Sequence, residues 1–294
     1  MDITTYLKEK CKIVDTALDS FLPPADRYPE VIHDAMRYSV MNGGKRLRPI
    51  LAIASCEAVG GDSKATLPTA CAIEFIHAFS LIHDDLPALD NDDLRRGKPT
   101  NHKVFGEAMA ILAGDGLLAY AFETIAKHTT GVPADVVVDV TCKVASATGM
   151  SGMIIGQVVD MISEGKKIDA DTLKYMHKNK TGALITVSCV TGAMLGGGTT
   201  EQIDALKVYG DKIGLAFQIA DDILDIVGDQ EKLGKPIGSD AENDKSTYPS
   251  LYGLEKSKEL ARQAVDEAVE ALSIFDTKAD PLREIARFIV ERDS

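Results

Sequence analysis

The chain has 294 residues, of which 45% are hydrophobic and 26% charged, as is typical of a soluble globular protein. Its net charge of −13 argues against nucleic acid and anionic membranes as partners, because both attract basic surfaces. Five scattered cysteines, never spaced as Cys-x-x-Cys, favour a cytoplasmic protein without disulfides or a zinc site. The charged N-terminus lacks a signal-peptide core, and no apolar run reaches the roughly 20 residues that cross a bilayer, so we expect no stable membrane insertion.

Apolar residues recur three or four positions apart along most of the chain, and alternation with period two is nearly absent. Glycine and proline pairs separate these segments, for example at residues 23–24, 60–61 and 196–198. No alternation of strands and helices supports a Rossmann or barrel fold. The pattern predicts a single all-α domain over residues 1–294, with about ten or more helices.

Several predicted helices have marked starts. Pro49 suits the first turn of a helix that continues over residues 50–59. Asp169 can cap the helix that follows it, and Thr199 with Gln202 three positions later forms a capping box.

A cluster of aspartates follows the predicted helix that carries His77. Asp84, Asp85 and Asp90 are its main members, and carboxylates this close repel one another unless a cation holds them. Oxygen ligands suit a hard ion such as Mg²⁺, which binds one or two carboxylates together with substrate phosphates. His77 lies seven positions before Asp84, on the same helical face. Pro87 disfavours helix, and a bend must bring Asp90 round to Asp84, because six helical residues rotate by about 240°.

A second cluster has helical spacing. Gln218, Asp221, Asp222 and Asp225 share one polar face of a helix whose neighbouring residues are strongly apolar. A solvated acidic surface is the alternative for any lone pair of aspartates. The apolar flanks instead favour a polar face that lines a binding site.

Basic residues accompany both clusters. A glycine turn precedes Lys45, Arg46 and Arg48 near a predicted helix start, and Arg95 and Arg96 follow the first aspartate cluster. In an acidic protein, such groups favour anion sites, because arginine forks bind phosphate oxygens in pairs. Ordinary solvated surface cations remain the alternative.

Lys180 interrupts an apolar helical stripe, between Met176 and Leu184. It either extends its ammonium group to water or pairs with an anion, because a buried unpaired charge is costly. Lys235 lies on a loop soon after the second aspartate cluster, where it could close over a phosphate, and Lys245 is a weaker candidate. Together, the clusters suit a diphosphate ester with a hydrocarbon tail, bound through Mg²⁺ between lysines and arginines.

These motifs resemble those of the trans-isoprenyl diphosphate synthases, most closely the bacterial type that makes farnesyl diphosphate. The resemblance covers nearly the whole chain, and two aspartate motifs with the blocks at residues 43–49 and 80–100 form a specific set. It implies an all-α bundle around a deep central cavity, usually a homodimer. It also implies head-to-tail condensation of isopentenyl diphosphate with an allylic diphosphate.

The resemblance also implies a role for each motif residue. The aspartates hold Mg²⁺ on the allylic diphosphate: Asp84, Asp85, Asp90, Asp221, Asp222 and Asp225. Basic side chains grip the same diphosphate: Arg95, Lys180 and Lys235, with Lys245 as a further candidate. A second basic set holds isopentenyl diphosphate: Lys45, Arg48, His77 and Arg96. Oxygen dipoles face the allylic cation: the Lys180 carbonyl, the Thr181 hydroxyl and the Gln218 amide.

The chemistry of these groups agrees with the implied reaction. Cations stabilise the leaving diphosphate, so the allylic C–O bond ionises, the isopentenyl double bond attacks, and a proton is lost. No side chain is an obvious base, and the departing diphosphate is expected to take the proton. Phe79 lies five positions before the first motif and is followed by the small Ser80, a pattern that the family associates with a farnesyl product. Geranylgeranyl and geranyl diphosphate are the alternative products.

Two rival interpretations predict different motifs. A terpene cyclase would usually replace the second aspartate motif, and this chain keeps residues 221–225 intact. A non-catalytic regulatory subunit of a related synthase commonly loses one motif, and this chain has both. The joint motif set therefore favours an enzyme.

Overall fold

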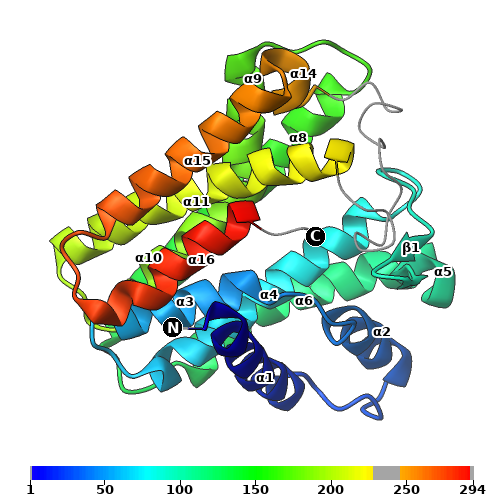
Figure 1. The fold of residues 1–294 in the computed structure, drawn as a ribbon. Coiled ribbons are helices and arrows are strands. Elements are labelled where there is room, and N and C mark those ends of the chain that lie inside the picture. The colour runs from blue at the N-terminus through cyan, green and yellow to red at the C-terminus, as the bar shows by residue number, and fades with distance from the viewer. Residues whose placement is uncertain (1, 228–245, 292–294) are drawn as a thin grey trace.

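The structure is a computed structural model that describes residues 2–227 and 246–291. Almost all of this part of the chain is helical, which confirms the all-α prediction (Figure 1). Its elements are α1 (Ile3–Phe21), α2 (Glu30–Val40), α3 (Leu47–Ala58), α4 (Ser63–Asp84), β1 (Leu94–Arg95), β2 (Lys98–Pro99), α5 (Asn101–Phe105), α6 (Glu107–His128), α7 (Ala134–Thr148), α8 (Met153–Ser163), α9 (Ala170–His177), the π-helical turn η1 (Lys178–Gly182), α10 (Ala183–Leu195), α11 (Thr200–Val227), α14 (Tyr248–Tyr252), α15 (Leu254–Ala271), the 3₁₀ turn η2 (Thr277–Ala279) and α16 (Asp280–Glu291).

The predicted helix starts are confirmed. The Thr199 hydroxyl accepts from the Gln202 backbone at 3.3 Å, and the Gln202 amide oxygen accepts from the Thr199 backbone at 2.9 Å. Asp169 caps α9 by accepting from the backbone N–H of Thr172 at 2.8 Å. Pro49 lies in the first turn of α3, which begins at Leu47.

Three hydrophobic cores hold the helices together, and the smallest of them joins α9 and α14 to α11 and α15. The other two are larger. One core joins α1 and α2 to α4, α6 and α7, and the other joins α3 to α10, α11, α15 and α16. Figure 1 shows α16 beside α11 and α15, and it also contacts α3. The two larger cores meet where α3 and α10 pack against α4.

α4 and α6 are each long and apolar enough to cross a membrane by length and composition, so the expectation that no such run exists was wrong. The two helices pack against one another and supply many residues of the first core. A buried core helix of a soluble protein passes the same test of length and composition, so the finding is weak evidence for a membrane span.

Two local features depart from the regular helical pattern. A short ribbon pairs Leu94 with Pro99 and Arg95 with Lys98, although no strand was expected from the sequence. The ribbon turns at Arg96 and Gly97, both with positive φ (55° and 75°), as tight hairpins require.

The second departure is η1, which interrupts the helical stripe around Lys180 between α9 and α10. π-helical turns are rare and occur frequently at functional sites. Gly156 of α8 touches this turn so closely that a Cβ atom would lie 2.2 Å from the Lys180 backbone nitrogen. The contact fixes the position of Lys180 against α8.

Candidate active site

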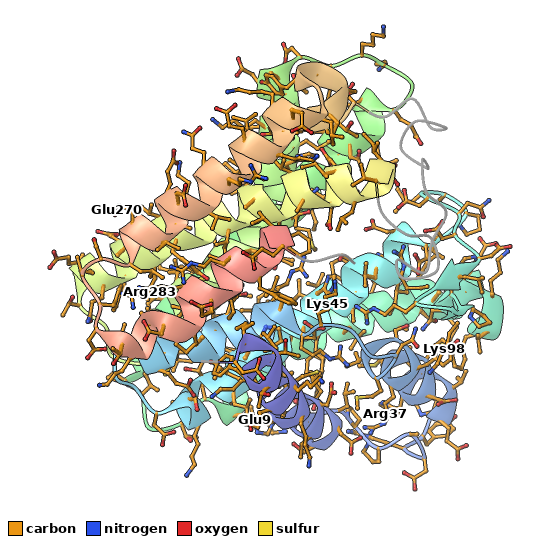
Figure 2. The ribbon with its side chains drawn as sticks, viewed as in Figure 1. Glu9, Arg37, Lys45, Lys98, Glu270 and Arg283 are labelled. Carbon is orange, nitrogen blue, oxygen red and sulfur yellow. The ribbon has the colours of Figure 1, made fainter. Side chains whose placement is uncertain are left out.

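A cavity of about 990 Å³ is lined by α1, the start of α3, α4, α11 and α16. Figure 2 shows Lys45 beside the start of α3, near α4. The cavity walls also carry apolar side chains from α11 and α16: Phe217, Leu224, Phe288 and Ile289. One cavity therefore combines a charged wall with an apolar wall.

The charged wall gathers eight of the site residues predicted from the sequence, but no residue of the first aspartate motif is among those that line it. Its basic side chains are Lys8, Lys45, Arg46, Arg48, Arg96 and Lys180, together with His77. Its acidic and amide side chains are Glu74, Asp221, Asp225 and Gln218. Segments more than 100 residues apart in sequence thus meet around one space.

The glycine turn before α3 brings Arg96 against the backbone. The Arg96 guanidinium donates to the Gly43 carbonyl, and a Cβ atom on Gly44 would lie 2.7 Å from the guanidinium atoms. Gly44 also has a φ of 124°, a conformation that side chains rarely adopt. The turn therefore requires glycine both for its conformation and for the close approach of Arg96.

Arg48 and His77 lie in a strongly basic environment. Burial and the neighbouring Arg96 lower the pKa of Arg48, while Glu74 and Asp221 oppose that shift. The buried Nε of Arg48 has no hydrogen-bond partner, which is the kind of donor that an anionic oxygen would satisfy. Burial, and then the surrounding arginines, lower the pKa of His77 well below its usual 6.5, so its imidazole is neutral at pH 7.

The first aspartate motif bends as Pro87 predicted. α4 ends at Asp84, and the Asp90 backbone N–H donates to the Asp84 carbonyl at 2.8 Å. The pKa of the Asp84 carboxyl is raised to about 6, mainly by burial; the nearby Lys180 lowers this pKa, and Asp90 contributes to raising it. The bend therefore brings Asp84 and Asp90 together near a lysine.

Asp85 faces a different partner. Its side chain is buried and accepts from Arg95 Nε at 3.0 Å, and Arg95 also donates to Asp92 at 3.1 Å. Arg95 is thus held by carboxylates of the motif that it follows.

The second aspartate motif divides in a similar way. Gln218, Asp221 and Asp225 line the cavity, whereas Asp222 is buried and accepts from the backbone N–H of Tyr248 at 2.8 Å. The expected single polar face therefore holds for three of the four residues. Asp222 lies about 100° around the helix from Asp221, so its side chain is directed elsewhere. Its hydrogen bond with Tyr248 attaches α14 to α11.

Lys180 pairs with an anion rather than extending to water alone. Its Nζ lies 2.5 Å from an Asp160 carboxylate oxygen on α8, and the pair is partly buried. Burial lowers the pKa of Lys180, but Asp160 and Asp84 outweigh it and raise the pKa overall. Lys180, Thr181 and Gln218 also line a smaller cavity of about 180 Å³ beside the first. The three proposed oxygen dipoles thus belong to residues that meet at one place.

The donor set fits Mg²⁺ with a phosphate ligand. Among the residues that the structure describes, no three His, Cys, Asp or Glu side chains lie close enough to hold a metal alone. Mg²⁺ instead takes one or two carboxylates and completes its shell with water and substrate phosphates. Burial, and to a smaller extent the neighbouring Asp90, raise the pKa of Asp84, and a divalent cation at this place would stabilise its ionised form.

The predicted residues outside this cavity are placed differently. Lys235 and Lys245 lie outside the described residues. Phe79 is buried on α4, and its ring packs edge-on against His83 at 4.9 Å between centroids. The Ser80 hydroxyl donates to the His77 carbonyl at 2.9 Å. Phe79 is not among the residues that line the two cavities described above, and its role in product length stays a prediction.

Two acidic residues near the site, Glu74 and Asp160, were not predicted from the sequence. Glu74 lies between apolar Ile73 and Phe75, and its side chain is buried on α4. A charged residue inside such an apolar run is the signal that could have identified it.

Comparison with known proteins agrees with this site. A family model described as polyprenyl synthetase matches residues 29–282. A geranylgeranyl diphosphate synthase of Cyanophora paradoxa is 51% identical over 294 residues, covering 100% of this chain and 97% of the relative.

Solved structures agree as well. The geranylgeranyl pyrophosphate synthetase of Pyrococcus horikoshii superposes with a TM-score of 0.90 at 34% identity, over 99% of this chain and 98% of that one. An FPP/GFPP synthase of Zymomonas mobilis gives a TM-score of 0.88 at 39% identity, over 98% and 99%. The chain therefore belongs to the polyprenyl synthetase family, the trans-isoprenyl diphosphate synthases, and is a prenyltransferase.

Proposed function

We propose that this enzyme condenses isopentenyl diphosphate with allylic diphosphates in a Mg²⁺-dependent reaction, and that its main product is geranylgeranyl diphosphate. The observation that carries the reaction is one cavity that combines a basic group, Lys180 and the second aspartate motif with an apolar wall. The first motif adjoins it, because Asp84 lies close enough to Lys180 for their charges to interact. That combination suits the binding of two diphosphate esters. The allylic substrate must lose its diphosphate when its hydrocarbon tail reacts.

The allylic diphosphate binds between the two aspartate motifs, beside Lys180 and Arg95. Mg²⁺ bound there supplies positive charge that stabilises the departing diphosphate. Lys180 stays protonated beside Asp160 and adds a fixed cation at the same place. The dipoles of Thr181 and Gln218 then face the allylic cation.

Isopentenyl diphosphate binds at the opposite basic group, Lys45, Arg48, His77 and Arg96. The neutral imidazole of His77 donates one hydrogen bond without adding charge, and the unpartnered Nε of Arg48 provides another donor. The apolar wall of α11 and α16 excludes water from the cation. The departing diphosphate takes the proton that the condensation releases.

The geranylgeranyl product is supported by relatives better than the farnesyl product that the sequence pattern favoured. The Cyanophora relative and the Pyrococcus structure are both named for geranylgeranyl diphosphate. The farnesyl expectation depended on Phe79 and Ser80. Structures named for farnesyl and for geranylgeranyl products share this fold, so the fold does not determine product length.

The test is to incubate the enzyme with Mg²⁺, isopentenyl diphosphate and dimethylallyl diphosphate, and to size the dephosphorylated products by chromatography. The proposal predicts a C20 alcohol as the main product. A C15 main product would keep the reaction and overturn the product length, and a C10 product would do the same. No product with any allylic starter would overturn the proposed reaction.

We also propose that the enzyme is a homodimer. Three neighbouring helices, α6, α7 and α8, expose large apolar side chains, including Leu112 (55%), Val138 (60%) and Ile162 (61%). Exposed apolar groups of this kind mark interaction surfaces when they are contiguous. Light scattering on the eluted protein should give twice the chain mass of 31.6 kDa, and a monomer mass would contradict the proposal.

A further inference from the structure

Arg46 differs from the other basic residues of the turn before α3. It precedes the helix with a φ of 50° and a ψ of 33°, a left-handed conformation that is uncommon for residues other than glycine. Its side chain is only 2% exposed. A buried guanidinium in an uncommon backbone conformation needs a set of partners that holds it there.

Its partners come from three different helices. Arg46 Nε donates to Asp15 of α1 at 2.8 Å, Nη1 donates to Glu74 of α4 at 2.9 Å, and Nη2 donates to the carbonyl of Val40, the last residue of α2, at 2.7 Å. The Glu74 side chain is 3% exposed, so this pair is shielded from water on both sides. Three nitrogens of one planar group thus fix the relative positions of α1, α2, α4 and the start of α3.

The charge of Arg46 is already neutralised by its own partners. Although Arg46 lines the cavity, two carboxylates accept from its guanidinium. Lys45 and Arg48, one position before and two positions after it, line the same cavity. Arg46 therefore fixes the backbone of the turn, while Lys45 and Arg48 direct their charges into the cavity.

We propose that Arg46 is a positioning residue for the isopentenyl diphosphate site, which orients Lys45 and Arg48 through its three hydrogen bonds to Asp15, Glu74 and Val40. The inference rests on the proposed function, since it assigns that site to isopentenyl diphosphate. Its essential element is the geometry of the fork rather than its charge. A lysine ammonium at this position carries the same charge but cannot reach three acceptors in one plane.

The test is Arg46→Lys, with Michaelis constants measured separately for isopentenyl diphosphate and for the allylic substrate. We expect the KM for isopentenyl diphosphate to rise by roughly tenfold or more, with kcat and the allylic KM within about twofold of wild type. Calorimetric binding of isopentenyl diphosphate in EDTA should weaken by the same factor. A general loss of structure would instead lower kcat and affect both substrates.

Glu57→Gln is the matched control. Glu57 of α3 forms an ion pair with Lys10 of α1, so it joins the same two helices as the pair of Arg46 with Asp15, but it does not line the cavity. This control should leave both KM values unchanged. If Arg46→Lys does not fold, Asp15→Ala removes one acceptor of the fork at a more exposed position, and should raise the same KM by about threefold.

The outcomes separate the inference from the proposed function. Wild-type protein that forms no prenyl product overturns the proposed function. Wild-type turnover with an unchanged isopentenyl diphosphate KM in Arg46→Lys overturns the positioning role alone. Equal rises in KM for both substrates, or the same rise in Glu57→Gln, would also overturn it, because either result shows a general effect on the helices.

Discussion

Gly44→Ala tests how closely the turn before α3 holds Arg96. The added Cβ atom would lie 2.7 Å from three atoms of the Arg96 guanidinium, nearer than real Cβ contacts come, so the flexible arginine must move away. A hydrogen bond to a charged group contributes about 1.5–3 kcal/mol. Loss of one such contact to a diphosphate therefore predicts a KM for isopentenyl diphosphate higher by roughly 10-fold to 150-fold.

Gly43→Ala provides the control for this substitution. Gly43 also has a positive φ, 78°, but a Cβ atom added there would meet no other atom within 4 Å. Both substitutions force a side chain into a left-handed conformation, at about 1–2 kcal/mol, so both should lower the thermal midpoint by a few degrees. Steady-state kinetics should show the large rise in KM only for Gly44→Ala. Equal KM values in the two variants would refute the reasoning that Arg96 binds the substrate from this position.

The remaining predictions concern the metal, the pH dependence and the product. Asp84→Ala and Asp221→Ala should each lower turnover by about 10³-fold or more while the helical circular dichroism persists, and a rate near wild type in either would contradict the two-motif site. Burial raises the pKa of Asp84 to about 6, so protons should compete there with the proposed Mg²⁺ below that pH. kcat/KM should fall as the pH drops through about 6, and the midpoint should move lower at higher Mg²⁺. If the pH midpoint of kcat/KM does not change with Mg²⁺ concentration, the assignment of this midpoint to Asp84 is contradicted. Phe79→Ala should lengthen the main product, because the family resemblance assigns the bulky side chain at this position a limit on chain length; an unchanged product distribution would remove Phe79 from that role.

Local patterns in the sequence predicted the helices and the nearest neighbours within each motif. The helical period placed Gln218, Asp221 and Asp225 on one wall, and Pro87 predicted the bend that joins Asp90 to Asp84. These predictions succeeded because they depend on residues within two turns of one another.

Pairing between distant helices could not be predicted in the same way. Arg46 and Glu74 are 28 positions apart, and Lys180 and Asp160 are 20 apart, so no helical period relates them. Asp222 accepts from the backbone N–H of Tyr248, 26 positions along the chain, and no helical period predicts that contact. The short ribbon at Arg95 was missed because two residues per strand are too few for an alternating pattern to appear.

The central claim is that this cavity joins two diphosphate substrates through an allylic cation. The most direct measurement is transfer of label from isotopically labelled isopentenyl diphosphate into a longer prenyl chain, with farnesyl diphosphate as the allylic partner and with Mg²⁺ or EDTA. The account predicts a labelled C20 product with Mg²⁺ and none with EDTA. Absence of any labelled chain with farnesyl, geranyl or dimethylallyl diphosphate would contradict it.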